Sequence, residues 1–220
     1  MIPALNGVAQ AGFTTRAAGD FSERDASAWE RLADEAGVSV PHRARQVHGV
    51  AVRVCAGEGR LHEAPADALI GVDGAAVAVR TADCVPVLLA APAHGIVAAA
   101  HAGWRGLAQG VLPVLLAALK RLGVAADALH AAVGPAIGPC CFTVAPTLAE
   151  RLAARGAPVI GGTPPRVDLR RWAVQMLMRA GVEEARVELA GGCTACEGAR
   201  FFSWRARRER ERMAAVVGLR

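Results

Sequence analysis

A run of 21 residues without a formal charge, from Cys84 to Trp104, limits the folds open to this chain. A run of that length could cross a lipid bilayer as a helix. Prolines, glycines and histidines inside it leave two strand-length apolar pieces, Val85–Ala91 and Ile96–Ala100. Continuous apolar pieces bounded by such residues are typical of strands that are buried on both faces. We therefore expect a buried β-sheet and no membrane span.

Other segments show the period of a helix or of a strand. Apolar residues at helical spacing predict helices over Asp25–Gly37, Leu107–Leu122, Thr147–Ala154 and Leu169–Ala180. Strand patterns occur at Val47–Val54, Ala75–Val79, Ala131–Val133 and Ala185–Leu189. The segment Gly156–Pro165 is rich in glycine and proline and predicts a loop, either a lid or an insertion. Strands and helices mixed in this order predict an α/β or α+β fold, in one domain over residues 1–220.

The distribution of charge gives no indication of a nucleic-acid or membrane partner. The net charge is +5, but residues 200–220 alone hold seven arginines against Glu209 and Glu211. The other 199 residues therefore carry 18 basic and 18 acidic groups, and their charges sum to zero. We expect the arginines of Arg205–Arg210 to form a solvent-exposed face, with Arg205 able to reach a site.

The cysteines are predicted to be reduced. Met1–Phe13 has neither the basic segment nor the long apolar segment of a secretory signal, so we expect a cytoplasmic protein. Cys193 and Cys196 form a CxxC motif, but no second CxxC supplies the two further ligands that structural zinc requires. We therefore expect no structural metal site here, and we expect the adjacent Cys140 and Cys141 to serve in packing.

Three side chains stand out because each lies beside a strand end or a tight turn: His48, Cys84 and His101. Two imidazoles and one thiolate with an open fourth position can hold a catalytic zinc ion. Their spacing matches no local zinc motif, so other roles stay open. Cys84 could be a nucleophile activated by either histidine, with Asp83 orienting the base. Each residue could also have a purely structural role.

A strand, a glycine turn and a helix start follow one another at Gly103-Trp104-Arg105-Gly106. Free backbone amides, the helix dipole and the guanidinium of Arg105 would together suit an anion such as phosphate. The alternative is a packing turn, in which the glycines allow close approach of the backbone.

Four ordered motifs resemble the YfiH or laccase-domain family. They are RQVHG at Arg45–Gly49, RTADCVP at Arg80–Pro86, AHAGWRG at Ala100–Gly106 and VGPAIGPCC at Val133–Cys141. The similarity extends from Gly12 to about Met213, which is nearly the whole chain. Members of this family have been called polyphenol oxidases, purine nucleoside phosphorylases and peptidoglycan editing factors.

The resemblance implies a fold, a metal site and an activity. The fold is an α/β/β/α layered sandwich. The metal is zinc, with copper as an alternative, held by the residues that match the family's ligands, His48, Cys84 and His101. The activities are phosphorolysis of adenosine, inosine, guanosine and methylthioadenosine, and deamination of adenosine. The expected partners are thus a purine nucleoside and phosphate. The oligomeric state stays open, with a monomer favoured.

Further residues are assigned on the same basis. Arg105 and the helix amides would position phosphate, with help from Arg45 or Arg16. Asp83 and Gln46 would orient the histidine ligands. The predicted catalytic set is His48, Cys84, His101, Asp83 and Arg105, and the predicted substrate-binding set is Arg16, Arg45, Gln46, Gly103, Gly106 and Arg205.

Departures from the family pattern bear on specificity. They lie at Ala17–Asp20, Phe142–Val144 and Phe202–Arg212. Three other functions stay open: an amidase that removes misplaced L-serine from cell-wall precursors, a copper-dependent polyphenol oxidase, and a non-catalytic binding module. Six histidines are too few for a multicopper centre, so any phenol oxidation should be slow and depend on added copper.

Overall fold

The uncharged run forms the centre of a sheet. In the computed structural model, which describes residues 1–21 and 25–219, Val85–Ala91 is strand β8 and Ile96–Ala102 is strand β9. The two strands pair antiparallel, and every residue in them is buried. Among the helices of the described residues, none is long and apolar enough to cross a membrane. The expectation of buried strands is therefore confirmed.

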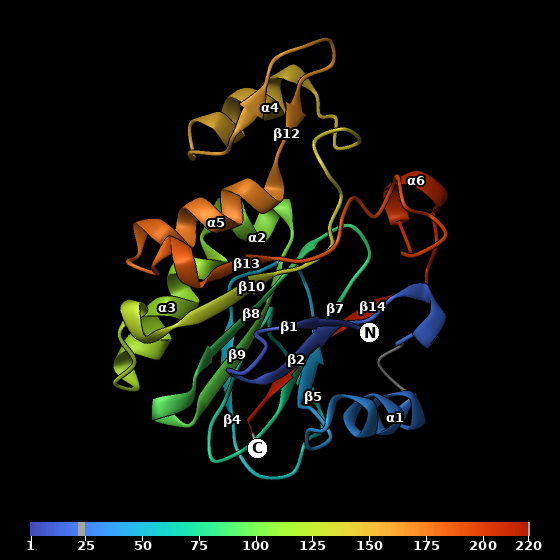
Figure 1. Ribbon diagram of the computed structural model, residues 1–220. Coiled ribbons are helices and arrows are strands. Elements are labelled where there is room, and N and C mark those ends of the chain that lie inside the picture. Colours follow the sequence, from blue (N-terminus) through green and yellow to red (C-terminus); the bar gives the residue numbers. More distant parts are fainter. Residues whose placement is uncertain (22–24, 220) are drawn as a thin grey trace.

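The pair lies in the centre of a six-stranded sheet, which packs face to face with a four-stranded sheet (Figure 1). The six-stranded sheet has the order β13-β10-β8-β9-β6-β4. Its remaining strands are β4 (Val52–Cys55), β6 (Ala68–Gly71), β10 (His130–Val133) and β13 (Val187–Leu189). The four-stranded sheet has the order β1-β2-β14-β7. Its strands are β1 (Ile2–Ala4), β2 (Gln10–Phe13), β7 (Val77–Thr81) and β14 (Met213–Gly218).

Side chains of the central strands point alternately to the two faces of the six-stranded sheet, and both faces are apolar. Val87 and Leu89 belong to the apolar core beneath the helices, whereas Leu88 and Ala90 belong to the core between the two sheets. Because successive side chains of a strand point to opposite faces, a strand that is apolar throughout can serve two cores at once. This explains why β8 needs a continuous apolar sequence.

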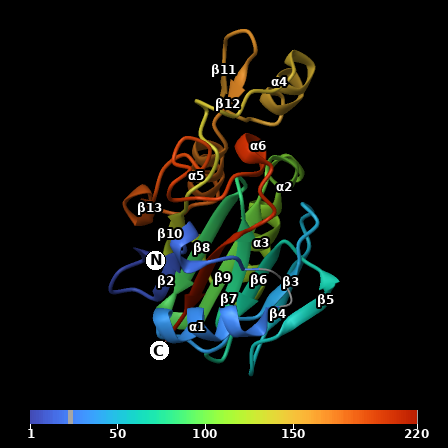
Figure 2. The ribbon, with the colours of Figure 1, turned by 90° about the vertical axis from the view of Figure 1, so that its right-hand side faces the viewer.

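Helices cover the outer face of each sheet. Helices α2, α3 and α5 pack on the six-stranded sheet, and α1 packs on the four-stranded sheet through Trp29 and Leu32, which contact Ala78 and Val216 (Figures 1 and 2). The helices are α1 (Ala26–Ala36), α2 (Trp104–Gln109), α3 (Val111–Arg121), α4 (Pro146–Ala153), α5 (Leu169–Arg179) and α6 (Trp204–Arg207). The layers run helix, sheet, sheet, helix, as the family resemblance implies.

The remaining strands form two small pairs. One is β3 (Arg43–Arg45) with β5 (Leu61–Pro65), and the other is β11 (Val159–Ile160) with β12 (Arg166–Val167). Strand β11 lies within Gly156–Pro165, the segment predicted as a loop, and β12 directly follows it. Together with α4 this pair protrudes from the layered body (Figure 2). Short 3-10 helices occur at Arg16–Ala18, Pro92–His94, Ala126–Ala128 and Glu184–Arg186.

Two predicted elements differ from the structure. The helix predicted over Leu107–Leu122 is divided into α2 and α3, because Gly110 adopts a left-handed conformation (φ 88°) that ends the first helix. The strand predicted over Val47–Val54 begins only at Val52. The preceding residues form a loop whose amides bind the carboxylate of Asp67, and this contact outweighs the alternating pattern.

Candidate metal and substrate site

Three strands bring two histidines and one cysteine together. Cys84 directly precedes β8, and His101 lies in the paired strand β9 opposite Pro86. His48 lies in the loop before β4, with its Nε2 3.7 Å from the Sγ of Cys84. The His48 and His101 ring centroids are 4.7 Å apart. Possible ligand atoms of all three residues lie within 4.8 Å of one another, so one metal ion could bind all three.

Asp67 holds both histidines in place. Its carboxylate is fully buried, and it accepts a 2.8 Å hydrogen bond from Nδ1 of His101. The same carboxylate accepts hydrogen bonds from the backbone amides of Val47, His48 and Gly49, at 3.2, 2.9 and 2.7 Å. Because Nδ1 of His101 faces Asp67, Nε2 is the ring nitrogen left to bind a metal. The predicted orienting residues, Asp83 and Gln46, do not contact the histidine rings in this way, and no sequence motif pointed to Asp67.

The electrostatics favour a charged thiolate. Burial raises the pKa of Cys84, but the charge of His101 and hydrogen bonds from both histidines outweigh it and lower that pKa to about 6. Burial lowers the pKa of His101, whereas the Cys84 thiolate and Asp67 raise it to about 9. Thiolate is the form of cysteine that binds metals and attacks electrophiles. The groups that lower the pKa of Cys84 come from distant parts of the sequence, so only the fold brings them to the thiol.

The backbone around the three residues is constrained. His48 and Asp83 adopt positive φ angles of 61° and 88°, which non-glycine residues rarely adopt and which recur at functional sites. Gly103 contacts the group directly, since a Cβ atom there would lie 2.9 Å from both Cys84 Sγ and His48 Cδ2. Gly103 and Gly106 thus permit close packing at the start of α2. Of the residues that the structure describes, neither glycine lines the cavity that lies next to this group.

The three residues lie at a cavity of about 710 Å³ that is rich in arginine and aromatic side chains. The arginines are Arg80, Arg105, Arg205, Arg208, Arg210 and Arg212, and the aromatic residues are Trp104, Phe142 and Trp204. Three guanidinium groups stack on these rings: Arg105 on Trp104, Arg205 on Phe142 and Arg208 on Trp204, at 4.5, 4.9 and 5.6 Å from the ring centroids. Arg205, Arg207, Arg208 and Arg210 are solvent-exposed, as predicted, and three of them, Arg205, Arg208 and Arg210, also line the cavity.

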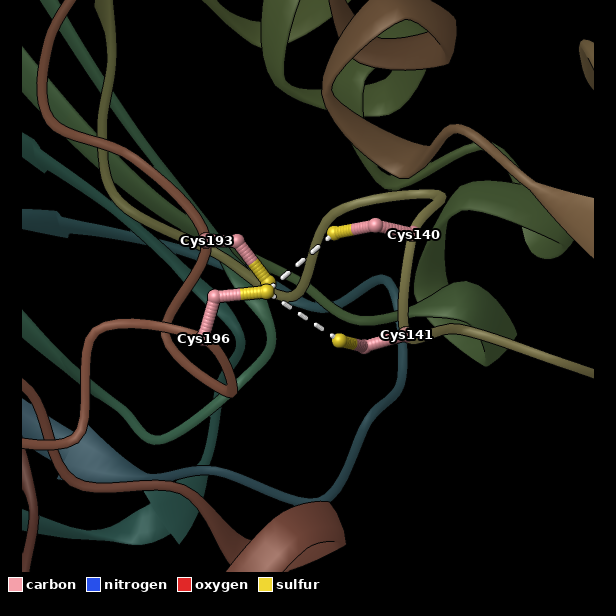
Figure 3. Close-up of side chains that lie close together, drawn as sticks. All are labelled: Cys140, Cys141, Cys193 and Cys196. Atoms are coloured by element: carbon pink, nitrogen blue, oxygen red, sulfur yellow. Dashed lines mark hydrogen bonds between the residues drawn. The ribbon is translucent and has the colours of Figure 1, made fainter.

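Four cysteines form a second group beside this wall (Figure 3). Cys140 and Cys141 follow β10, and Cys193 and Cys196 follow β13. Their sulfur atoms all lie within 4.8 Å of one another. The expectation that the CxxC motif lacks two further ligands is therefore wrong, because β10 and β13 pair in parallel and bring the two loops to the same end of the sheet.

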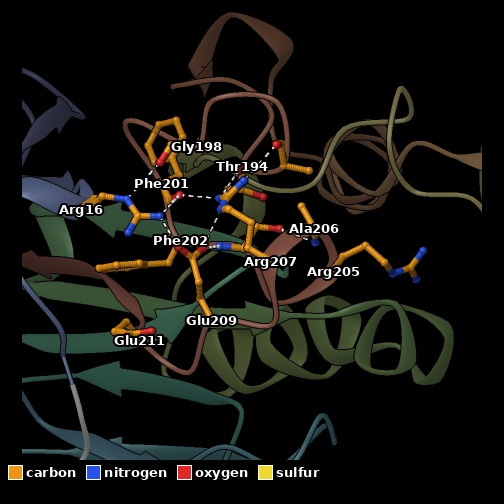
Figure 4. A network of polar contacts seen from close by, with 12 residues as sticks. Arg16, Thr194, Gly198, Phe201, Phe202, Arg205, Ala206, Arg207, Glu209 and Glu211 are labelled. Atoms are coloured by element: carbon orange, nitrogen blue, oxygen red, sulfur yellow. Dashed lines mark hydrogen bonds and ion pairs between the residues drawn. The ribbon is translucent and has the colours of Figure 1, made fainter.

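Other predicted site residues have structural contacts. Arg16 forms an ion pair with Glu209 and donates a 3.0 Å hydrogen bond to the Gly198 carbonyl (Figure 4). Arg45 is exposed at the end of β3, and in the part of the chain that the structure describes neither arginine lines the cavity. Gln46 does line it, but its side-chain amide pairs with the backbone of Arg80 at 2.8 Å in both directions.

Asp83 organises the loops around the cavity rather than the histidines. Its carboxylate accepts hydrogen bonds from the Thr194 hydroxyl at 2.7 Å and from the Arg205 amide at 2.6 Å. Both partners belong to the last third of the chain. Asp83 therefore joins the loop that carries Cys84 to the segment that carries the cavity arginines.

The donor set fits a zinc ion. Two imidazole nitrogens and one thiolate are ligands that zinc accepts, with a fourth position available for water or substrate. Copper accepts the same donors. The fixed orientation of His101 and the low pKa of Cys84 both favour metal binding, because ligands must be deprotonated and correctly aimed.

Comparison with known proteins gives close relatives. A "Purine nucleoside phosphorylase" of Xylella fastidiosa (strain 9a5c) is 41% identical over 199 residues, which cover 85% of this chain and 75% of the relative. An "Adenosine deaminase RL5" from an unknown prokaryotic organism is 35% identical over 150 residues, covering 63% of this chain and 56% of the relative. The crystal structure of YlmD from Geobacillus stearothermophilus superposes with a TM-score of 0.83 at 27% identity, covering 97% of this chain and 93% of that one.

The family comparison covers almost all of the sequence. A family model described as "Multi-copper polyphenol oxidoreductase laccase" matches residues 7–220. The match includes the three possible metal ligands and the arginine-rich wall. The chain therefore belongs to this laccase-domain family, as the motifs of its sequence indicate.

Proposed function

We propose that this protein is a metal-dependent purine nucleoside phosphorylase that uses zinc. The observation that carries the proposal is the cavity itself, where possible metal ligands lie close to stacked aromatic and guanidinium groups. A purine base can stack on aromatic rings, and arginine is suited to phosphate. The name of the Xylella fastidiosa relative supports the same activity.

The chain's own residues account for binding and orientation. Arg105 lies at the start of α2, where free helix amides also favour an anion, so this end of the cavity suits inorganic phosphate. Stacking on Trp104 limits the freedom of its guanidinium before phosphate binds. In phosphorolysis a phosphate oxygen bonds to C1′ of the ribose while the bond from C1′ to the base breaks. Fixing the phosphate near C1′ is therefore the main task of these residues.

The metal would add a distinct contribution. Zinc held by His48, Cys84 and His101 would act as a Lewis acid toward a substrate oxygen and would lower the pKa of a water molecule. Asp67 keeps His101 oriented for that ion. We place the protein in the cytoplasm, where nucleosides and phosphate are both available.

The test is product analysis with and without phosphate. Purified protein given inosine and phosphate should release hypoxanthine and ribose 1-phosphate, and no base should form when phosphate is omitted. Arg105→Gln should raise the KM for phosphate about 10-fold or more, because hydrogen bonds to charged groups contribute about 1.5–3 kcal/mol. The control is Arg155→Gln, which should not change the KM, because Arg155 is exposed, follows α4 and is not among the residues that line the cavity. A phosphate-independent release of base would contradict phosphorolysis.

A second activity at the same site is deamination of adenosine. The relative named "Adenosine deaminase RL5" and the donor set of the three ligands favour it. Here water replaces the amino group at C6 and ammonia leaves, so adenosine should give inosine without phosphate. Parallel assays with a serine-containing muramoyl precursor and with a phenol plus copper test the amidase and the oxidase. Turnover of either one, without turnover of nucleosides, would overturn the proposal.

A further inference from the structure

The four cysteines beside the cavity wall are arranged as a second metal site. Cys196 Sγ lies 3.5 Å from Cys140 Sγ and 3.4 Å from Cys141 Sγ. A disulfide requires about 2.05 Å, and one sulfur atom can form only one such bond. All four sulfur atoms are mutually within 4.8 Å. Four ligands at the usual zinc–sulfur distance of about 2.3 Å form a tetrahedron with edges of about 3.8 Å, close to this arrangement.

The backbone around the sulfurs is built for close approach. The Gly138 amide donates a 3.2 Å hydrogen bond to Cys193 Sγ, as amides do toward metal-bound thiolates. A Cβ atom at residue 138 would lie 3.2 Å from Cys140 Sγ and 3.3 Å from Cys193 Cβ, so a side chain there would crowd the group. A parallel β-bridge between Ala136 and Cys193 fixes the relative position of the two loops, and in it the Thr194 amide donates to the Ala136 carbonyl at 3.1 Å.

We propose that Cys140, Cys141, Cys193 and Cys196 bind one structural zinc ion with tetrahedral geometry. Four thiolates in a closed shell are typical of structural zinc and leave no open position for substrate. An iron–sulfur cluster places iron and sulfide between the cysteines and holds their sulfur atoms further apart. The pairwise contacts in this group therefore favour a single ion.

The ion would stabilise the cavity wall. Phe142 follows Cys141 and lines the cavity, and Thr194 follows Cys193 and donates its hydroxyl to Asp83. Zinc would join the loop after β10 to the loop after β13, and through these neighbours it would fix one side of the substrate site. This role is independent of the reaction proposed above.

A third group, His42, Cys55 and His62, affects the design of the experiment. Its residues also lie within 4.8 Å of one another. His42 Nδ1 and His62 Nε2 already form a 3.0 Å hydrogen bond, which satisfies these nitrogens without a metal. Zinc content is therefore best compared between variants, so that any ion bound elsewhere cancels.

The experiment measures zinc in purified full-length variants by elemental analysis after dialysis against a weak chelator. Cys196→Ser should lose about one equivalent relative to wild type, because it removes one of the four ligands. Glu197→Gln, next to it in the sequence, is the control and should keep the full content. Cys84→Ser should lose only the zinc of the proposed catalytic site. Failure of the two proposals can therefore be distinguished.

A second measurement covers the case in which Cys196→Ser does not fold. In Cys84→Ser protein, titration with a mercurial reagent should release about one zinc ion, and X-ray absorption should show sulfur ligands at about 2.3 Å. Equal zinc in wild type and Cys196→Ser would overturn the proposal. So would iron in place of zinc, or the loss of free thiols to disulfides in protein denatured without reductant.

Discussion

Asp67 shows how one buried residue can organise a candidate metal site. It binds three loop amides and the ring of His101, so a single carboxylate fixes two ligands that are far apart in sequence. Burial raises the pKa of Asp67, but its hydrogen bond from His101 and those from the loop amides hold the pKa below the usual value. The site therefore retains a permanent negative charge behind its histidines.

The Cys84 thiol should react as a thiolate in metal-free protein. Its pKa of about 6 lies below the ordinary 9.0, so the thiolate predominates above pH 6 and is lost as the pH falls below it. We expect the rate of alkylation of Cys84 by iodoacetamide to rise with pH, with a midpoint near pH 6. Mass spectrometry of the peptide that contains Cys84 measures this rate. Asp67→Asn should move the midpoint upward, because Asp67 helps to keep His101 protonated. A wild-type midpoint near 9 would contradict this electrostatic account.

At the residue scale, sequence motifs identify the three residues that the fold brings together, but not the carboxylate that supports them. The motifs around His48, Cys84 and His101 are distinctive, whereas Asp67 lies in no motif. It reaches His101 because β6 pairs antiparallel with β9 and sets Ala68 opposite Ala100. That register depends on tertiary pairing, which local sequence does not determine.

At the scale of elements, the start of α2 is the most constrained point of the site. Gly103→Ala would place a methyl group 2.9 Å from Cys84 Sγ and from His48 Cδ2. Changes to groups that orient metal ligands lower metal affinity about 10- to 100-fold, and we expect Gly103→Ala to lower zinc affinity by a factor of that order. Competition with a zinc-binding dye measures the zinc affinity. Gly161→Ala, whose Cβ would contact nothing within 4 Å, is the control. Unchanged affinity in Gly103→Ala would show that the loop can move aside.

Elements with a strong local signal were predicted well. Helix α1 begins after Asp25, whose side chain caps the Ala28 amide, and ends at Gly37, as the sequence indicates. The loop at residues 47–51 was mistaken for strand because its alternating pattern is that of a strand, while the carboxylate that holds it lies about twenty residues further along the chain. Non-local contacts of this kind override local propensity.

At the scale of the whole molecule, the two sheets are held in close contact by small residues. Gly134, at the end of β10, faces the ring of Phe13 in β2, and a Cβ atom there would lie 2.4 Å from it. We expect Gly134→Ala to destabilise the fold by about 1–3 kcal/mol, the usual cost of overpacking. Equilibrium unfolding in urea measures the change. A second variant that combines it with Phe13→Leu should recover part of the loss, because the smaller side chain gives room. Additive losses would contradict a direct clash.

The layered architecture followed from the family resemblance, and the central strands followed from the uncharged run. Periodicity alone could not place β1, β2 and β14 together, since they come from opposite ends of the chain. The same holds for the arginine-rich wall: the predicted exposure of Arg205–Arg210 is confirmed, but only the fold places Arg205, Arg208 and Arg210 at the cavity. Long-range pairing thus decides both the second sheet and the shape of the cavity.

Strand β14 lies between β2 and β7, and it connects the earliest part of the four-stranded sheet to the middle of the chain. During synthesis on the ribosome, β2 and β7 lack their common pairing partner until Met213–Gly218, which forms β14, has been made. Until then each of them exposes an unpaired strand edge, which can pair with other nascent chains. Closure of the four-stranded sheet thus depends on β14, and a translation product that lacks this strand would be a target for chaperones and proteases.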